Sequence, residues 1–451
     1  MSRLLVHDCE VVVTMDDAGT ELPEASILVE DGVISWVGTG PPPAEPDERL
    51  DGSGQVALPG LVNCHHHLYQ SLTRVRAQGE GLFGWLVELY PVWARLDEEW
   101  ERAASRVALA QLALSGCSTT TDHHYVFPPA AGDPLGVEVE AARELGIRFH
   151  PCRGSMDLGE SDGGLPPDAV CEPTEDALAR SEEAVKRFHD PAPGSMVRIA
   201  LAPCSPFSVT ERLMRETADL ARRHGVRLHT HLAETLDEER FCLERFGRRP
   251  TELMETWGWL GEDVWFAHCV HLSDPDVRRL GETRTGVSWC PSSNLRLGAG
   301  IAPGRALIEA GARVGLGTDG SASNEGARLS DEVHQALLVS RAEGPEPGLS
   351  AREALWMATR GGASVLGRDD VGSLEAGKRA DVALFAVDGM GFAGAGTDPV
   401  AALAFGGPDR VRQLLVEGQP VVADGHLVAA EEEEIAREGH RVARRIAEAG
   451  G

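Results

Sequence analysis

The feature that most constrains the fold of this chain is a unit of one apolar strand followed by polar residues, which recurs eight times between residues 55 and 324. Helical patterns such as TERLMRETADLARRHG separate most of the strands, and a glycine often stands just before the next one. Eight such units predict a (β/α)8 TIM-like barrel, an α/β fold whose active site lies at the carboxyl ends of its strands. The strands are expected in QVALPGLVNCHHH, GCSTTTDHHY, GIRFHPCRGS, MVRIALAPCSP, VRLHTHLAET, DVWFAHCVHL, GVSWCPSSN and RVGLGTDGSASN.

Short β-strand patterns occupy both ends of the chain, outside the predicted barrel. LLVHDCEVVVTM and ASILVEDGVISWVG lie near the N-terminus, with Asp31-Gly32 as a hairpin turn. The same pattern returns in ADVALFAVDG and VRQLLVEGQPVVADGHLV. We therefore expect residues 1–56 and 366–430 to pair into one small β-sandwich domain. Residues 57–365 would form the barrel, and residues 431–451 a charged C-terminal helix.

The composition narrows the classes of partner. The chain has 42 basic and 71 acidic residues, and its net charge of −29 repels nucleic-acid polymers and anionic membrane surfaces, but not an uncharged small molecule. The 9 cysteines include no Cys-x-x-Cys pair, which is typical of reduced thiols in a cytoplasmic protein. The first residues, MSRLLVHDCEVVVTMDD, lack the features of a signal peptide, and no apolar run is long enough to span a bilayer.

Three consecutive histidines, His65, His66 and His67, follow the first predicted barrel strand. If this run is extended, His65 and His67 point to one face and His66 points to the other. Two imidazoles on one face at the end of a strand can share a metal ion. An isolated His-x-His is also consistent with a polar loop, so the rest of the chain has to decide.

Metal-capable side chains also follow three later strands. His231 follows the fifth strand, His268 the sixth and Asp319 the eighth. Together with His65 and His67 they form a set of nitrogen and oxygen donors that suits a divalent ion such as zinc. Such a site, with a water on the metal, could generate hydroxide near neutral pH. Spacing alone leaves open whether His268 is a ligand or a neighbour of one.

Glu234 stands three residues after His231, in the segment HLAET. A carboxyl group at that distance along the chain can lie beside the same metal and its water. Since a positioned carboxyl group can carry a proton in either direction, Glu234 is the candidate proton shuttle.

The segments PGLVNCHHH, HTHLAET, AHC and GTDGSASN, in this order and spacing, resemble the amidohydrolase superfamily, and the resemblance covers essentially the whole chain. It implies a metal-dependent hydrolase on a distorted (β/α)8 barrel. Two-metal members commonly use a carboxylated lysine at the end of the fourth strand, whereas MVRIALAPCSP contains no lysine, and neither Lys186 nor Lys378 lies at a barrel strand end. The sequence is therefore similar to the one-metal deaminase branch.

That resemblance implies one Zn²⁺ per chain, with Fe²⁺ as the alternative ion. By resemblance, the ion is held by His65, His67, His231 and Asp319. His268 would polarise the bound water and Asp319 would accept its proton, while Glu234 would protonate a ring nitrogen so that ammonia can leave the adjacent carbon. By analogy alone a homodimer is expected. The alternative from another class is a metal-free scaffold of the same fold, and the complete residue set argues against it.

Three further residues bear on the substrate. Gln70 lies where guanine-deaminase relatives place a glutamine that binds the base, and a side-chain amide can donate to and accept from a purine edge. Cys204 stands where such relatives carry an arginine. Trp93 stands where relatives that act on nucleosides carry a ribose-binding glutamate, which favours a free base.

Longer segments, including NCHHHLYQSLTR, TTTDHHYVFP and APCSPFSVT, resemble bacterial 8-oxoguanine deaminases. This resemblance implies deamination of 8-oxoguanine to urate and ammonia. Triazine hydrolases share similar segments, and guanine and pterin deaminases of the same superfamily are further alternatives. At the second strand end, His123, His124 and Tyr125 could contact a substrate or serve in packing.

Overall fold

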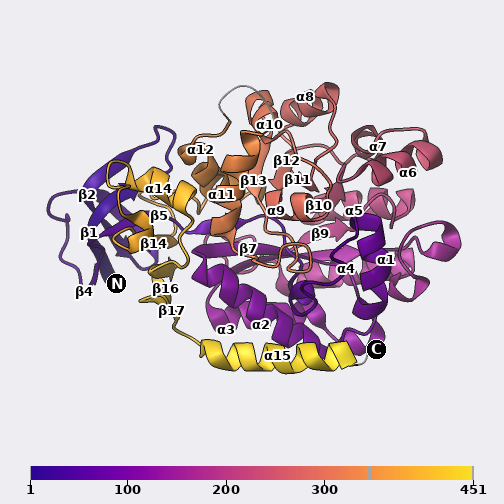
Figure 1. Cartoon of the computed structure of the whole chain (residues 1–451), viewed down its shortest axis with the longest axis horizontal. Coiled ribbons are helices and arrows are strands. Elements are labelled where there is room, and N and C mark those ends of the chain that lie inside the picture. Colours follow the sequence, from indigo (N-terminus) through magenta and orange to yellow (C-terminus); the bar gives the residue numbers. More distant parts are fainter. Residues whose placement is uncertain (1, 343–347, 449–451) are drawn as a thin grey trace.

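The structure, a computed structural model, describes residues 2–342 and 348–448, and its centre is a sheet of eight parallel strands with helices around it (Figure 1). The strands follow one another in chain order across the sheet, each paired in parallel with the next. They are β6 (Leu61–Asn63), β7 (Cys117–His124), β8 (Arg148–Ser155), β9 (Ala200–Pro203), β10 (Arg227–Leu232), β11 (Val264–His268), β12 (Gly286–Trp289) and β13 (Arg313–Leu316). The predicted TIM-like barrel is confirmed.

Hydrogen bonds around Asn63 bring the first and last strands of this sheet together. The backbone N–H of Cys64 donates to the carbonyl oxygen of Leu316 at 2.9 Å. The Asn63 side chain accepts from the backbone N–H of Thr318 at 2.9 Å and donates to its hydroxyl at 3.2 Å. Because His65 and Asp319 follow directly on these strands, this junction places their side chains next to each other.

The helices around the barrel begin and end at residues that favour those positions. Asp133, Thr210 and Thr235 are N-caps whose side chains accept a backbone N–H of the first turn. Gly146 and Gly225 end helices with φ of 74° and 67°, left-handed values that glycine adopts without steric cost, just before the next strands begin. The sequence signal of a glycine before a strand therefore marks real helix ends.

The helices up to the end of the barrel are α1 (Leu82–Trp93), α2 (Glu98–Leu114), α3 (Pro134–Leu145), α4 (Thr174–Phe188), α5 (Glu211–His224), α6 (Leu236–Phe246), α7 (Pro250–Trp257), α8 (Asp274–Glu282), α9 (Pro291–Arg296), α10 (Gly304–Ala310), α11 (Leu329–Ser340), α12 (Ala351–Trp356) and α13 (Gly362–Val365). A π-helical stretch, Met357–Gly361, joins α12 to α13, and the 3₁₀-helix η1 spans Leu68–Leu72.

A second sheet joins strands from both ends of the chain, as predicted. In the described residues it is one mixed sheet of nine strands, ordered β17-β16-β15-β14-β5-β1-β2-β3, with β4 beside β1. Asp31 and Gly32, with φ of 48° and 79°, form the predicted tight turn between β2 and β3. The strands are β1 (Arg3–Val13), β2 (Glu21–Glu30), β3 (Val33–Thr39), β4 (Glu48–Asp51), β5 (Gln55–Pro59), β14 (Val382–Ala386), β15 (Gln413–Val416), β16 (Gln419–Ala423) and β17 (His426–Leu427).

The segment QVALPGLVN, read from the sequence as one barrel strand, is divided between the two sheets. Residues Gln55–Pro59 form β5, which pairs antiparallel with β14, and only Leu61–Asn63 belong to the barrel. The division falls at Gly60, where an added Cβ would clash with the Ser118 side chain. Alternation of apolar residues shows that a segment is extended, but it does not show which sheet the segment joins.

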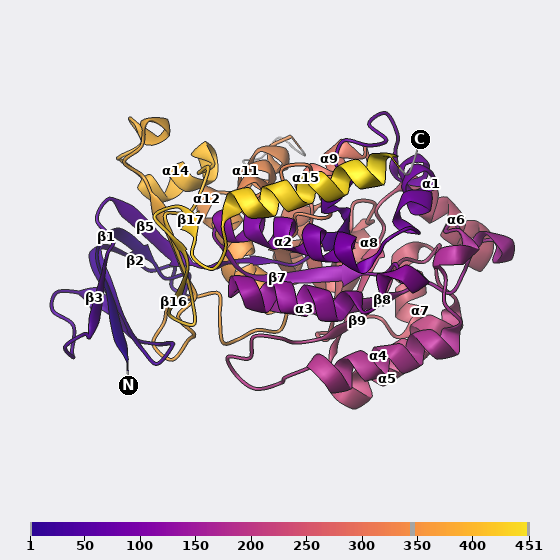
Figure 2. The same ribbon diagram turned by 90° about the horizontal axis from the view of Figure 1, so that it is seen from below.

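The C-terminal helix α15 (Glu432–Glu448) lies along α2 on the outside of the barrel (Figure 2). Ion pairs join the two helices, from Arg106 to Glu438 at 2.6 Å and from Arg445 to Asp97 at 2.8 Å. The last three residues of the predicted helix, 449–451, lie outside the described residues. The remaining helix of the described chain is α14 (Pro399–Gly406), which lies between β14 and β15 in the sequence.

Across residues 2–342 and 348–448, no helix combines the length and the apolar character that crossing a membrane requires. All nine cysteines are free thiols, and all except Cys171 are buried.

Candidate active site

The polar residues singled out from the sequence meet at the carboxyl end of the barrel. His65 and His67 follow β6, His231 lies in β10, His268 ends β11 and Asp319 follows β13. All five side chains are buried. Because parallel strands of a barrel end on the same side, residues as far apart in the sequence as His65 and Asp319 can lie in contact.

The donor atoms of His65, His67 and Asp319 lie within 4.8 Å of one another, and His231 lies beside His67. Asp319 Oδ1 is 3.4 Å from His65 Nε2 and 3.3 Å from His67 Nε2, and the two Nε2 atoms of His67 and His231 are 3.1 Å apart. A tetrahedral ion with bonds of about 2.0–2.1 Å has ligands separated by about 3.3 Å. The residues present therefore fit a tetrahedral divalent metal.

The ring protons of two of these histidines point away from the shared centre. His67 Nδ1 lies 2.7 Å from the carbonyl oxygen of His123, and His231 Nδ1 lies 2.6 Å from that of Cys204. A carbonyl oxygen only accepts, so each Nδ1 carries the proton and each Nε2 offers its lone pair to a metal. Burial also lowers the pKa of His67 to about 4 and that of His231 to about 3, which keeps both rings neutral, as ligands must be.

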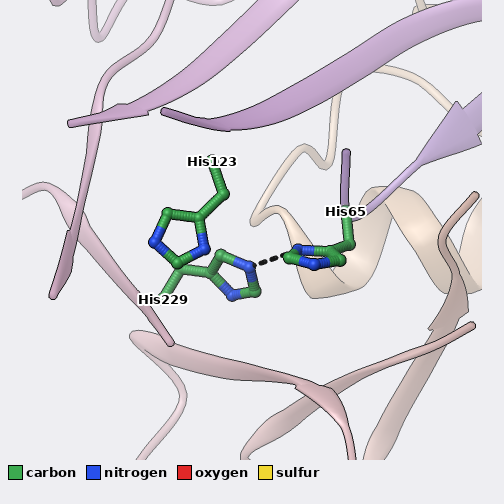
Figure 3. Close-up of side chains that lie close together, drawn as sticks. All are labelled: His65, His123 and His229. Atoms are coloured by element: carbon green, nitrogen blue, oxygen red, sulfur yellow. Dashed lines mark hydrogen bonds between the residues drawn. The ribbon is translucent and has the colours of Figure 1, made fainter. Parts of the chain in front are cut away.

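The third imidazole of the set, His65, has a side chain as its partner. Its Nδ1 lies 2.8 Å from Nε2 of His229, a residue two positions before His231 (Figure 3). Its Nε2 is buried and has no hydrogen-bond partner within the described chain. A buried ring nitrogen without a partner is costly in a folded protein, and a metal ion would satisfy it.

His268 lies to one side of this donor set. Its Nε2 is nearest to two carboxylates, 3.6 Å from Glu234 Oε2 and 3.9 Å from Asp319 Oδ2, and its Nδ1 lies 2.8 Å from Asn294 Oδ1. Burial lowers the pKa of His268, but the negative charges of Glu234 and Asp319 outweigh burial and raise it above its ordinary value. His268 can therefore donate a proton or a hydrogen bond between the two carboxylates.

The carboxyl group of Glu234 is buried beside the donor set with few partners. Burial raises its pKa from 4.5 to about 7, an effect that the positive character of His268 partly opposes. The backbone N–H of Glu234 donates to Glu238 at 2.9 Å, which fixes the loop that carries it. A carboxyl group with a pKa near neutrality can both give and take a proton during a reaction.

Asp319 is held in place and ionised by several donors. The hydroxyl groups of Ser293 and Ser323 donate to Oδ2 at 2.6 and 3.2 Å, and the backbone N–H of Gly320 donates to Oδ1 at 2.7 Å. Asp319 and His268 both have a positive φ, 60° and 72°, which residues other than glycine rarely adopt. Such backbone strain is common where function fixes the position of a side chain.

A cavity opens directly onto these groups. It is lined by His67, Gln70, Leu82, Trp85, Leu86, Tyr90, Tyr125, Cys204, Ser205, Phe207, His231, Glu234, His268, Leu297 and Asp319. The predicted substrate residues Gln70 and Cys204 are among them, and the amide oxygen of Gln70 is buried without a hydrogen-bond partner in the described chain. The lining contains neither arginine nor lysine. The cavity therefore suits an uncharged molecule with flat faces and polar edges.

Trp93 is the predicted substrate-binding residue that the structure leaves outside this cavity. It ends α1, is fully buried, and its indole N–H donates to the Thr73 hydroxyl at 3.2 Å. Its ring packs edge-on against Tyr69, with centroids 5.4 Å apart. The preceding turns of α1 supply the cavity wall instead, through Trp85 and Tyr90. The position of a residue in a helix does not show from the sequence whether its turn of the helix faces the cavity.

The remaining residues of the second strand end divide between cavity and core. Tyr125 lines the cavity, whereas His123 and His124 do not. His124 is buried and lies 2.8 Å from the carboxylate of Glu138. His66 is buried away from the donor set, and both of its ring nitrogens have no hydrogen-bond partner in the described chain.

Four residues that line the cavity or hydrogen-bond to the candidate site residues carry no individual prediction from the sequence: Trp85, Ser293, Asn294 and His229. Ser293 and Asn294 belong to CPSSN, one of the eight polar clusters, so their place at a strand end was visible although their partners were not. His229 shares a face with His231 because residues two positions apart lie on the same face of a strand. Trp85 carried no sequence signal beyond an apolar helix position.

Comparison with known proteins shows to which family the chain is similar. The model of the amidohydrolase family matches residues 56–421. The chain is 48% identical over 432 residues to 8-oxoguanine deaminase from Pseudomonas aeruginosa, covering 94% of this chain and 95% of that protein. It is 37% identical to hydroxydechloroatrazine ethylaminohydrolase from Pseudomonas sp. (strain ADP), covering 99% and 96%. A zinc complex of atrazine chlorohydrolase from Arthrobacter aurescens superposes with a TM-score of 0.91 at 35% identity, covering 98% of this chain and 100% of that one.

Proposed function

The chain belongs to the amidohydrolase family, and from this premise we propose that it is a zinc-dependent deaminase that hydrolyses 8-oxoguanine to urate and ammonia. Its relatives make it a hydrolytic aminohydrolase that acts on C–N bonds. In the proposed reaction one water is consumed, the exocyclic amino group leaves as ammonia, and a carbonyl replaces it on the ring.

The observation that carries the deaminase assignment is the position of Glu234. Its carboxyl group has a pKa of about 7 and lines the same cavity as His67, His231 and Asp319, and His67 Nε2 lies 3.3 Å from Asp319 Oδ1 and 3.1 Å from His231 Nε2. A proton donor on one side of a planar ring and an activated water on the other is the arrangement that hydrolysis of an amino-substituted ring requires.

His65, His67, His231 and Asp319 would hold the zinc, through three nitrogen donors and one oxygen donor. Ferrous iron accepts the same donor set and is the alternative ion. When bound, the ion supplies a water molecule of lowered pKa close to the substrate. We propose a single ion at this site, because no lysine lies at a barrel strand end to bridge a second one.

The protein's own residues then move the protons. Asp319, whose Oδ2 is oriented by Ser293, accepts the proton of the attacking water. His268 is held by Asn294 and donates a hydrogen bond toward that water. Glu234 gives its proton to the ring nitrogen beside the amino-bearing carbon, which makes that carbon more electrophilic. Return of the water's proton from Asp319 to the amino group lets it leave as ammonia, and the hydroxyl group left on the ring becomes a carbonyl as it gives its proton back to Glu234.

The choice of a free purine base rests on the cavity lining and on the relatives. The amide of Gln70 can donate to and accept from a purine edge, and aromatic walls from Trp85 and Tyr90 suit a planar ring. Neither an arginine nor a lysine lines the cavity to hold a phosphate. The identity of 48% with 8-oxoguanine deaminase supports that base in particular.

An aminotriazine is the second candidate substrate. The chain is 37% identical to hydroxydechloroatrazine ethylaminohydrolase, and a triazine also presents an amino-bearing carbon flanked by ring nitrogens. Guanine and amino-substituted pterins share that pattern. The same site residues would act on each of these rings, so discrimination must come from contacts at the cavity wall, including those of Cys204.

The test is product analysis with zinc-loaded protein and 8-oxoguanine in ¹⁸O-labelled water. We expect urate carrying one ¹⁸O atom and an equal amount of ammonia. An absence of ammonia from 8-oxoguanine, together with release of an amine from the triazine, would replace the first candidate by the second. An absence of ammonia from all four rings would refute the deaminase assignment.

A further inference from the structure

A buried imidazole, His229, lies one layer below the proposed metal ligands. It precedes His231 by two residues in β10, so both side chains point into the barrel. His231 lines the cavity, whereas His229 is fully buried and does not. His229 therefore cannot touch a substrate, and its contacts are with other protein groups.

The hydrogen bonds of His229 have a fixed direction. Its Nδ1 lies 3.0 Å from the carbonyl oxygen of Trp265, which can only accept, so Nδ1 carries the ring proton. The neutral ring then has an acceptor at Nε2, 2.8 Å from His65 Nδ1. His65 must donate in this bond, and its own Nε2 keeps the lone pair that faces Asp319.

The ring of His229 is also fixed in position. It stacks on the indole of Trp265, with centroids 4.4 Å apart and planes 16° from parallel. The indole N–H of Trp265 donates to the carbonyl oxygen of Cys64 at 3.1 Å. Since Cys64 is the neighbour of His65 in the chain, these contacts form a closed ring of four residues that orients the His65 imidazole.

His65 differs in this respect from the other two imidazole ligands. The Nδ1 protons of His67 and His231 are held by backbone carbonyl oxygens, of His123 and Cys204, which no substitution removes. The proton of His65 is held by a side chain. Among the three, only the tautomer of His65 can be released by changing one residue.

We propose that His229 is a positioning residue that fixes the tautomer of His65 and thereby sets the affinity of the site for zinc. Partners of metal-bound histidines typically change metal affinity 10–100-fold when they are lost. The inference rests on the proposed metal site. It assigns to His229 a role separate from that of His231, two residues later in the same strand.

His123 is a natural control. It is as fully buried as His229, and its ring centroid lies 5.0 Å from that of His229 and 5.9 Å from that of His65 (Figure 3). Its Nε2 lies 2.8 Å from the carbonyl oxygen of Ala202, and its Nδ1 has no hydrogen-bond partner in the described chain. It is therefore a nearby imidazole that does not hold the proton of His65.

The experiment measures the zinc dissociation constant by competition with a chromophoric chelator. His229→Phe keeps a ring that can stack on Trp265 but removes the acceptor, and we expect zinc to bind 10–100-fold more weakly. His229→Gln places an amide oxygen near the former Nε2 and is expected to bind zinc within threefold of the wild-type protein. His123→Phe is also expected to bind zinc within threefold of the wild-type protein. At saturating zinc His229→Phe should regain most of its kcat, because His229 does not touch the cavity.

Two results would overturn the inference: His229→Phe binding zinc as tightly as the wild-type protein, or His123→Phe losing as much affinity as His229→Phe. If His229→Phe does not fold, ¹⁵N NMR of the histidine rings in the zinc-free wild-type protein decides. A His65 protonated at Nδ1 supports the inference, and protonation at Nε2 refutes it. A wild-type protein that binds no zinc would instead refute the metal site itself.

Discussion

Replacement of Glu234 by glutamine is expected to inactivate the protein and to stabilise it at the same time. Glutamine keeps the shape of the side chain but cannot deliver a proton, so kcat should fall about 10²-fold or more. The metal donors are unchanged, so zinc should still bind. The substitution is expected to stabilise the fold because the wild-type carboxyl group is buried.

The magnitude of that stabilisation can be worked out from the pKa of Glu234. Burial raises it from 4.5 in the unfolded chain to about 7 in the folded protein. Stability is therefore lost as the pH rises from the unfolded to the folded value, because only the unfolded chain ionises there. At about 1.4 kcal/mol for each pKa unit, the loss above pH 7 is about 3 kcal/mol, and at pH 4.5 it is below about 1 kcal/mol. Glu234→Gln removes this loss.

The assay is urea unfolding of zinc-free wild-type and Glu234→Gln protein at pH 4.5 and pH 8, with ammonia release measured on the zinc-loaded forms. The unfolding free energy of Glu234→Gln should exceed that of the wild-type protein by a small amount at pH 4.5 and by a large amount at pH 8. Glu332→Gln is the matched control, because burial raises the pKa of Glu332 to about 7 too but Glu332 lies outside the cavity. It should keep activity within about tenfold. Near-normal turnover by Glu234→Gln would remove Glu234 from the mechanism.

Three further outcomes are expected. Elemental analysis should find about one zinc ion per chain in the active site, and Asp319→Asn should bind that ion more weakly. A requirement for two ions in the cavity for full activity would contradict the single-ion site. Gln70→Leu should raise KM about tenfold with a smaller change in kcat, the cost of about one lost hydrogen bond, and an unchanged KM would remove Gln70 from substrate binding. Trp93→Phe should lower the unfolding free energy by about 1 kcal/mol and leave KM unchanged, whereas a raised KM would return Trp93 to the cavity.

Much of the fold could be predicted because each unit carries its own boundaries. Caps such as Thr210 and glycines such as Gly225 are local signals, and the order of eight strands then leaves few topologies open. The meeting of the candidate metal donors could also be predicted, since polar residues at the ends of parallel barrel strands lie on the same side of the barrel. The division at Gly60 could not, because both halves of that segment are apolar and extended.

The rest of the site depends on distances that a sequence does not contain. Trp93 and Tyr90 lie on the same helix, yet only Tyr90 lines the cavity, because the end of the helix that carries Trp93 extends past the cavity. The roles of Asn294 and His229 depend on which ring nitrogen faces which partner. Such contacts join residues far apart in the chain, so no local pattern predicts them.

The most direct test of the account is kcat/KM for 8-oxoguanine, guanine, isoxanthopterin and an aminotriazine, measured side by side on one zinc-loaded preparation. We expect 8-oxoguanine to be preferred by tenfold or more, which corresponds to about 1.4 kcal/mol in transition-state binding. The cavity with Gln70 and Cys204 at its wall would then discriminate among rings that the same proton donor can serve. A tenfold preference for guanine or for the triazine would contradict the proposed substrate.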